Sequence, residues 1–138
     1  MWKINLNIGI VLHNEEWKVY LDSMRRIDYA IARAAWGADY MDPSTFLDLF
    51  ITDGGNNETG WSNAEYDRLC AVAANTGDQA VRFAAYQKAE AILMDEMPIL
   101  PIFYSTRPRL IRPSVKGWYP NLLDQPNYKS IYLDPKAE

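Results

Sequence analysis

One short segment brings together side chains that could recognise a charged ligand. Residues 32–43 read Ala-Arg-Ala-Ala-Trp-Gly-Ala-Asp-Tyr-Met-Asp-Pro and contain Arg33, Trp36 and Asp39. A carboxylate removed from water needs a positively charged or hydrogen-bonding partner, and an indole ring can form an apolar wall beside it. Asp39 and Trp36 are therefore candidates for binding a cationic group.

The same segment also has a purely structural interpretation. In that interpretation Trp36 fills a core, Arg33 pairs with a surface acid, and the aspartates cap turns. We favour it for Asp42, because an Asp directly before Pro43 is typical of a helix N-terminus. Asp39 has no comparably good capping role, so both interpretations stay open for that residue.

The sequence lacks the familiar catalytic and metal-binding motifs. One histidine, His13, and one cysteine, Cys70, cannot supply a metal site built of several such ligands. The chain has no Gly-x-Ser-x-Gly motif, and Asp53-Gly-Gly lacks the Lys-Ser/Thr of a phosphate-binding loop. Cys70 lies on the apolar side of an expected helix, where a small buried side chain is the usual role. We therefore expect no enzymatic activity, no cofactor and no metal.

Composition and charge favour a globular protein that does not bind nucleic acid. The 138 residues are 49% hydrophobic and 23% charged, which suits one compact domain with a core. The net charge of −4 provides no general attraction to nucleic acid or anionic lipid. No apolar run approaches the roughly 20 residues that span a bilayer. No secretory pattern follows Met1, so we expect either a cytoplasmic protein or a chain whose export signal lies upstream.

The first third of the chain predicts two strands and a helix. Residues 3–12 begin with alternating apolar and polar positions and then become continuously apolar, which indicates a strand. A helix is expected from Asn14 or Glu15 to Arg26, with an apolar stripe of Trp17, Tyr20, Leu21 and Met24. Residues 29–36 predict a second strand, which would put the candidate binding residues at its carboxyl end, a common place for ligand sites.

Helices dominate the middle of the chain. A short helix should follow Pro43, and Ser62 and Glu65 have the spacing of a capping box for the next helix. Asp78 should cap a helix that runs to about Glu96, with an inner face of Val81, Ala85, Ala89, Ile92 and Leu93. The stretch 99–133 mixes short strands and turns, and we expect it to pack beside strands absent from this chain. The pattern as a whole predicts one α+β unit.

A series of short motifs occurs along essentially the whole chain. They are Gly9-Ile-Val-Leu, Glu16-Trp17, Asp28-Tyr-Ala-Ile-Ala-Arg33, Trp36-Gly-Ala-Asp-Tyr-Met-Asp-Pro43, Phe46-Leu, Asn56-Asn57, Asn63-Ala-Glu-Tyr-Asp67, Arg82-Phe-Ala-Ala-Tyr-Gln-Lys-Ala-Glu90, Pro98-Ile-Leu-Pro101 and Pro113-Ser-Val-Lys-Gly117. In this order they are more specific together than singly, and they resemble the oligopeptide- and dipeptide-binding receptors of bacterial ABC importers, the extracellular solute-binding protein family 5.

The resemblance implies a two-lobed fold like that of the periplasmic binding proteins. This chain would be a C-terminal lobe fragment of it, an α+β unit with a mixed sheet and flanking helices. About residues 1–97 would form much of the ligand-cleft lobe, and about residues 98–138 the segment that returns toward the other lobe. Most of the opposing lobe and an export signal are then expected upstream.

The resemblance also implies a function and roles for particular residues. Such a receptor captures extended oligo- or dipeptides in the cleft between its lobes. Asp39 would pair with the α-ammonium of the peptide, Trp36 would wall the pocket, and backbone groups from Ala35 to Gly37 would bond the peptide. Arg33 resembles an arginine that, in some members, approaches the carboxylate of a short ligand.

Partners and location follow from the same resemblance. The expected partners are a peptide, the membrane permease of the importer and the missing N-terminal lobes, and the expected location is the periplasm or the cell surface. The isolated chain should bind peptide weakly or not at all, because the cleft needs a second wall. Its unpaired strands could instead be covered by self-association. The alternative function is a ligand-sensing or protein-interaction module of the same fold without transport.

Overall fold

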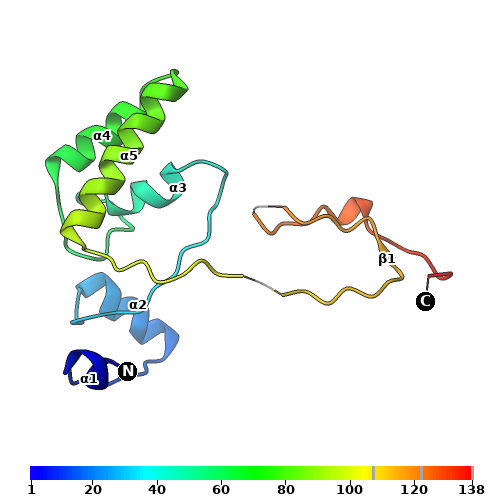
Figure 1. Ribbon diagram of the computed structural model, residues 1–138, viewed down its shortest axis with the longest axis horizontal. Helices are drawn as coiled ribbons and strands as arrows, with labels where there is room; N and C mark the ends of the chain where they lie inside the picture. The colour runs from blue at the N-terminus through cyan, green and yellow to red at the C-terminus, as the bar shows by residue number, and fades with distance from the viewer. Residues whose placement is uncertain (107, 122, 138) are drawn as a thin grey trace.

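The computed structural model describes residues 1–106, 108–121 and 123–137. Figure 1 shows three parts: a packed helical unit, two helices near the N-terminus beside it, and an extended arm that leads away to the C-terminus. The arm comprises residues 108–121 and 123–137. The elements in chain order are α1 (Trp2–Leu6), α2 (Trp17–Arg26), α3 (Ser44–Leu47), η1 (Asp48–Phe50), α4 (Ala64–Ala74), α5 (Gln79–Glu96), β1 (Val115–Lys116), η2 (Tyr128–Ser130) and β2 (Tyr132–Leu133).

The helical unit is built on the antiparallel pair of α4 and α5. Asp78 caps α5, because its carboxylate accepts hydrogen bonds from the amides of Ala80 and Val81 at 2.8 and 3.2 Å. The predicted cap and the predicted end of this helix near Glu96 are both confirmed. Val81 is wrong as an inner-face residue, since it is 46% exposed in the first turn of the helix.

The start of α4 differs from the prediction by one residue. Asn63, and not Ser62, is the N-cap, and its side-chain oxygen accepts from the amides of Glu65 and Tyr66, both at 3.0 Å. The amide group of Asn63 also donates to a carboxylate oxygen of Glu96 at 2.6 Å. This hydrogen bond to the C-terminal end of α5 orients the Asn63 side chain as the cap. The spacing of residues around Asn63 in the sequence does not predict a contact with Glu96.

The core lies between α4, α5 and α3. Small side chains let the two long helices approach closely, and Tyr66 fills the remaining space with a ring that has no exposed surface. The hydroxyl of Tyr66 donates to the backbone carbonyl of Leu47 at 2.6 Å, which ties α3 to α4. The buried residues of this cluster are Leu47, Tyr66, Leu69, Cys70, Ala73, Ala85, Tyr86, Ala89 and Leu93.

The helix predicted from Asn14 or Glu15 to Arg26 is present as α2. It begins at Trp17, after Glu16 accepts a hydrogen bond from the amide of Lys18 at 2.9 Å. Met24 is the buried member of the predicted stripe, while Trp17 is exposed and stacks on Tyr20 with ring centroids 5.4 Å apart.

Both strands predicted in the first third of the chain are wrong. Residues 2–6 form helix α1, residues 7–12 have no regular structure, and nearly all of this segment is exposed. Residues 29–36 have no regular structure either. An alternating pattern indicates a strand only where a neighbouring strand can pair with it, and no described strand lies alongside these segments.

The sheet is smaller than the mixed sheet that was expected. Within the described residues it consists of β1 and β2, which pair antiparallel with Val115 opposite Leu133. Gly117 follows β1 at φ +74°, and a Cβ there would lie 1.8 Å from the carbonyl oxygen of Ser130. Glycine is therefore required where the two sides of the arm meet.

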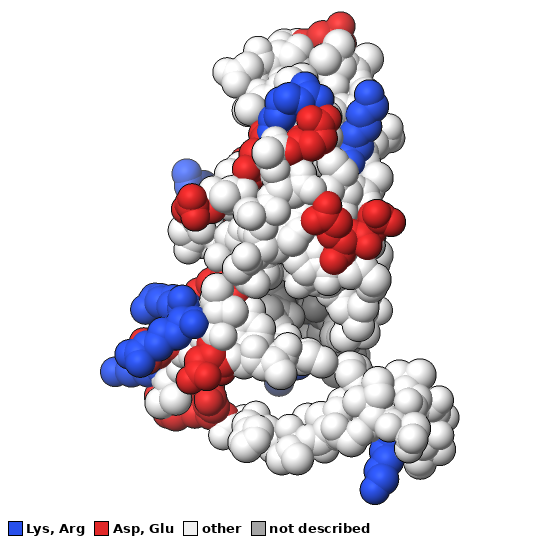
Figure 2. Space-filling model, turned by 90° about the vertical axis from the view of Figure 1, so that its left-hand side faces the viewer, with Lys and Arg blue, Asp and Glu red and all other residues white. Residues whose placement is uncertain are grey.

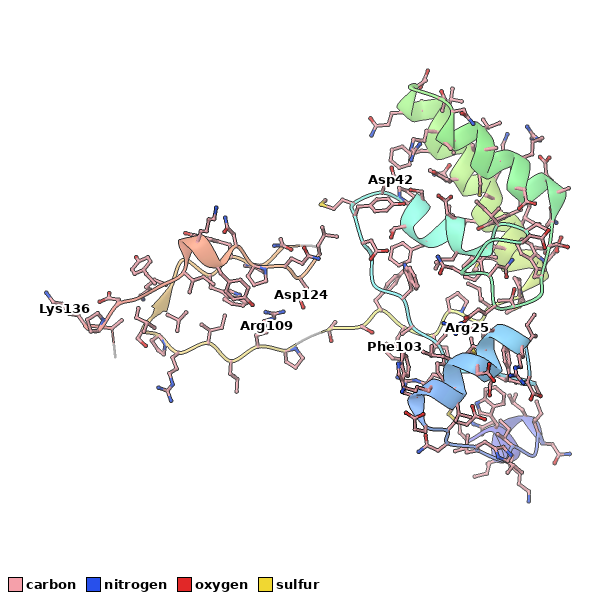
Figure 3. All side chains as sticks on the ribbon, turned by 180° about the vertical axis from the view of Figure 1, so that it is seen from behind. Arg25, Asp42, Phe103, Arg109, Asp124 and Lys136 are labelled. Atoms are coloured by element: carbon pink, nitrogen blue, oxygen red, sulfur yellow. The ribbon has the colours of Figure 1, made fainter. Side chains whose placement is uncertain are left out.

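Charged and aromatic side chains hold the arm together. The guanidinium of Arg109 lies over the ring of Trp118, 5.1 Å from its centroid, and forms an ion pair with Asp124. Figure 3 shows Arg109 and Asp124 pointing toward one another from the two sides of the arm. Trp118 in turn packs edge-on against Tyr128 at 6.4 Å.

Candidate functional site

The segment that carries the predicted binding residues runs from α2 to α3 and is tied at both ends. On the α2 side, the hydroxyl of Tyr20 donates to the backbone carbonyl of Arg33 at 3.0 Å. On the α3 side, the segment ends in a series of hydrogen bonds around Asp42. Figure 3 shows Asp42 on this connection, directly before α3. The residues in between are therefore held in place by hydrogen bonds at both ends of the segment.

Asp42 accepts the hydrogen bonds that fix the segment on the α3 side. One of its carboxylate oxygens accepts from the amide of Ser44 at 2.9 Å and from the guanidinium of Arg82 at 2.7 Å. The hydrogen bond from Arg82 holds the pKa of Asp42 at about 2, well below its ordinary value. The prediction that Asp42 is the N-cap and Pro43 the first helical residue is wrong by one position, because the N-cap of α3 is Pro43 and the helix starts at Ser44. Asp42 precedes the cap and still accepts from the amide of the first helical residue.

The backbone of Asp39 is fixed by the first turn of α3. Its amide donates to the hydroxyl of Thr45 at 3.1 Å, and Thr45 is buried. The hydroxyls of Tyr40 and Ser44 are hydrogen-bonded to each other at 3.0 Å. These contacts fold the chain around Asp39 back over the start of the helix.

Asp39 and Trp36 line one pocket. Its volume is about 120 Å³, enough for a small polar group such as an ammonium. A carboxylate and an aromatic face in one concave site suit a cation, since one supplies charge and the other a polarisable wall. The pocket is lined by Trp36, Asp39, Tyr40, Ser44, Thr45, Asp48, Leu49 and Asn56.

A second hollow lies along the same loop. It has a volume of about 320 Å³ and is bounded mainly by apolar side chains. Leu123, from the arm, closes one side of it, so the arm reaches back to the loop that carries Asp39. The lining residues are Ala38, Tyr40, Met41, Asp42, Pro43, Phe46 and Leu123.

The structure brings together only some of the predicted site residues. Trp36 and Asp39 share the smaller pocket, whereas Arg33, Ala35 and Gly37 are not among its lining residues. All five residues are exposed. Because residues 29–36 are not a strand, the expected alternation of side chains between two faces does not order this segment. Gly37 is in open space, and a Cβ there would meet nothing within 4 Å.

Six lining residues of this pocket were not predicted as site residues: Tyr40, Ser44, Thr45, Asp48, Leu49 and Asn56. Ser44 and Asp48 are four residues apart on a short helical stretch, and this spacing, which puts side chains on one face, was the available signal. Asn56 comes from the loop after η1, and nothing local places it at the pocket. Burial and the negative charge of Asp42 raise the pKa of Asp48, so this carboxylate also gains from a nearby positive charge.

The exterior carries charges of both signs. On the face shown in Figure 2, Lys and Arg side chains lie among Asp and Glu side chains and do not form one continuous basic surface. In the part of the chain that the structure describes, no three His, Cys, Asp or Glu side chains gather as a metal site would require. The helices of that part are all too short or too polar to cross a membrane.

The chain is similar in sequence to known peptide-binding proteins. No family model matches the sequence. The chain is 42% identical over 118 residues to the oligopeptide-binding protein OppA of Bacillus subtilis, a match that covers 85% of the chain and 22% of that protein. It is also 42% identical over 118 residues to the periplasmic murein peptide-binding protein MppA of Escherichia coli, covering 86% of the chain and again 22% of the relative. The chain thus spans about a fifth of the length of these relatives.

Solved structures agree with the sequence relatives. The structure of the Escherichia coli murein tripeptide-binding protein MppA matches with a TM-score of 0.84 at 38% identity, over 96% of this chain and 26% of that one. Haemophilus influenzae OppA, solved in complex with the peptide RPPGFSPFR, matches with a TM-score of 0.83 at 39% identity and the same coverage. The names of these relatives describe peptide-binding proteins. The chain is accordingly homologous to a C-terminal part of the oligopeptide-binding members of solute-binding protein family 5.

Proposed function

We propose that this chain forms one wall of a peptide-binding cleft in the receptor component of an ABC importer, and that Asp39 binds the α-ammonium of the peptide. The observation that carries this proposal is the shared pocket of Asp39 and Trp36. The names of the related proteins support a peptide as the ligand. A peptide's free amino end is a compact cation, which is the group that such a pocket suits.

The other predicted residues have supporting roles in this proposal. Trp36 forms the apolar wall beside the ammonium, and the exposed backbone from Ala35 to Gly37 offers hydrogen-bonding groups to an extended peptide. Arg33 is exposed and would approach a ligand carboxylate from outside the pocket. We propose no catalytic role for any of these side chains.

The proposal includes the remainder of the receptor. Residues 1–97 belong to the ligand-cleft lobe, and residues 98–138 return toward the opposing lobe, which would complete the cleft. The permease of the importer would be the second partner, and the location would be the periplasm or the cell surface. Exposed apolar side chains at both ends of the chain, such as Leu12 and Leu110, support such a missing partner surface.

The test compares two forms of one peptide on the full-length protein that contains this chain. Asp39→Asn should weaken binding of the free-amine peptide by about tenfold or more and leave binding of the N-acetylated peptide nearly unchanged. Asp53→Asn is the matched control, because Asp53 is exposed and lies outside both pockets. Calorimetry measures both affinities, and equal weakening of the two peptides by Asp39→Asn would refute the ammonium role.

A second experiment addresses the chain by itself. We expect the 138 residues alone to bind the same peptide weakly or not at all, because the cleft would have one wall. Calorimetry on the isolated chain, with its oligomeric state measured by analytical ultracentrifugation, checks this expectation. Micromolar binding by a monomer would contradict the need for a second lobe, and a self-associated chain would point to coverage of its exposed apolar surface by another copy.

A further inference from the structure

An ion pair joins the first turn of α5 to the loop that carries Asp39. Arg82 belongs to this turn, Asp42 lies two residues before the start of α3, and the two are 40 residues apart in sequence. A nitrogen of the guanidinium lies 2.7 Å from a carboxylate oxygen, and the side chains are only 24% and 30% exposed. Partial burial separates this pair from the other helix ion pairs, such as that of Arg68 and Glu65, whose side chains are more than half exposed.

Arg82 is held in place by more than Asp42. Its second terminal nitrogen donates to the backbone carbonyl of Ala73 at 2.5 Å, at the end of α4. Its guanidinium lies over the ring of Tyr86, 5.0 Å from the centroid, and that ring is buried in the core. The guanidinium of Arg82 is therefore held by α4, by α5 and by the core, in addition to its ion pair with Asp42.

From Asp42 the contacts lead to the proposed ligand residue. The oxygen that receives Arg82 also accepts from the amide of Ser44 at 2.9 Å, which sets the first turn of α3. The next residue, Thr45, then accepts the amide of Asp39 at 3.1 Å. The chain of contacts runs without a gap from the helical core to the backbone of Asp39.

We propose that Arg82 is a positioning residue for ligand binding: through Asp42 it fixes the start of α3 and thereby the backbone from which the Asp39 carboxylate projects. This inference rests on the proposed function, because it assumes that Asp39 binds the ammonium. It adds a residue that does not line the pocket and that no feature of the peptide would touch.

The geometry requires arginine and not merely a positive charge. Two nitrogens of one planar group bind Asp42 and Ala73 at the same time, while the flat face stacks on Tyr86. A lysine ammonium is a single point with no flat face, so it cannot make these three contacts together. Arg82→Lys should therefore behave as a partial loss, intermediate between the natural residue and glutamine.

The experiment measures how strongly the full-length protein prefers a free-amine peptide over its N-acetylated form. Arg82→Gln should reduce this preference by about threefold to tenfold, chiefly by weakening the free-amine peptide. Arg68→Gln is the matched control, since it removes an arginine paired with a carboxylate three residues away on α4, and neither residue lines a pocket beside the loop. Thermal unfolding of every variant separates loss of the fold from loss of the preference.

A double variant tests whether Arg82 acts through Asp42. Asp42→Asn and Arg82→Gln remove the two ends of one contact, so the double variant should show the preference of the weaker single variant and not the product of both losses. Multiplicative losses would overturn the proposed route. If Arg82→Gln is too unstable to measure, Arg82→Lys retains the charge and gives the same comparison with a smaller change.

The outcomes separate this inference from the function on which it rests. If the unaltered protein shows no preference for the free amine, the proposed function fails and the role of Arg82 falls with it. If Asp39→Asn abolishes the preference while both Arg82 variants retain it, the function stands and the positioning role alone is overturned. Equal weakening of both peptides by Arg82→Gln would likewise overturn it, because that pattern indicates general destabilisation of the cleft.

Discussion

The backbone amide of Asp39 donates a hydrogen bond to the side-chain hydroxyl of Thr45, 3.1 Å away. Thr45 is buried in the first turn of α3, so its hydroxyl is a fixed acceptor. This bond sets the direction in which the chain leaves Asp39, and it joins an exposed loop to the packed helical unit.

Thr45→Val keeps the shape of the side chain and removes the acceptor. A hydrogen bond contributes roughly 1 kcal/mol, so we expect the full-length protein to bind a free-amine peptide about twofold to tenfold more weakly. Thr45→Ser keeps the hydroxyl and should bind within about twofold of the unaltered protein. Calorimetry decides between the two, and equal affinities for the Val and Ser variants would show that the hydroxyl has no part in binding.

Ala89 marks the closest packing of the helical unit. It has no exposed surface, and Ala89→Leu would force additional carbons between α4 and α5. We expect the free energy of unfolding of this chain to fall by about 1–3 kcal/mol, measured by urea denaturation. Ala91→Leu makes the same change at an exposed position of the same helix and should alter stability by less than about 0.5 kcal/mol. A similar loss in both variants would contradict the tight packing described here.

Tyr66→Phe removes the hydroxyl that binds the carbonyl of Leu47 at 2.6 Å. The carbonyl would remain buried without its donor, so the expected loss of stability is about 1–3 kcal/mol. Tyr104→Phe, at a residue that is 98% exposed, serves as the control and should leave the urea midpoint unchanged. If Tyr66→Phe had no effect, another donor would have to replace the hydroxyl, and the tie between α3 and α4 would not depend on it.

The lowered pKa of Asp42 predicts how the free energy of unfolding depends on pH. Arg82 holds the pKa of Asp42 at about 2 in the folded chain, against an ordinary value of 3.8. A carboxyl with a lowered folded pKa stabilises the fold fully above its ordinary value and loses that contribution as the pH falls from 3.8 through about 2. Asp42→Asn should therefore flatten the decline in unfolding free energy over this range.

The measurement for Asp42 is urea denaturation at a series of acidic pH values. Asp22→Asn is the control, because Asp22 pairs with Arg26 on the exposed surface of α2 and should leave the profile parallel to that of the unaltered chain. A profile for Asp42→Asn that stays parallel as well would show that the Arg82 pair does not stabilise the fold.

Patterns among neighbouring residues predicted those parts of the fold and the site that are set by nearby residues in the sequence. Asp78 caps α5 because its partners lie two and three residues ahead, and the predicted neighbours Trp36 and Asp39 lie close together in one short segment and line the same pocket. The alternating apolar and polar residues of 3–12 led to a wrong prediction, because a strand needs a second strand to pair with and this segment does not contain one. The pairing of Arg82 with Asp42 spans 40 residues and has no local signal, and the same is true of Asn56 at the pocket.

Among the described residues, nearly every buried apolar side chain belongs to α3, α4 or α5, and this has a consequence for the pocket. Asp39 is hydrogen-bonded to that core through Thr45, whereas Trp36 is 45% exposed in a segment without regular structure. Segments with few buried contacts open at little cost, so the two walls differ in stiffness. In the proposed role of this pocket, we expect the position of Asp39 to stay the same from one peptide to the next and the position of Trp36 to adjust to the ligand.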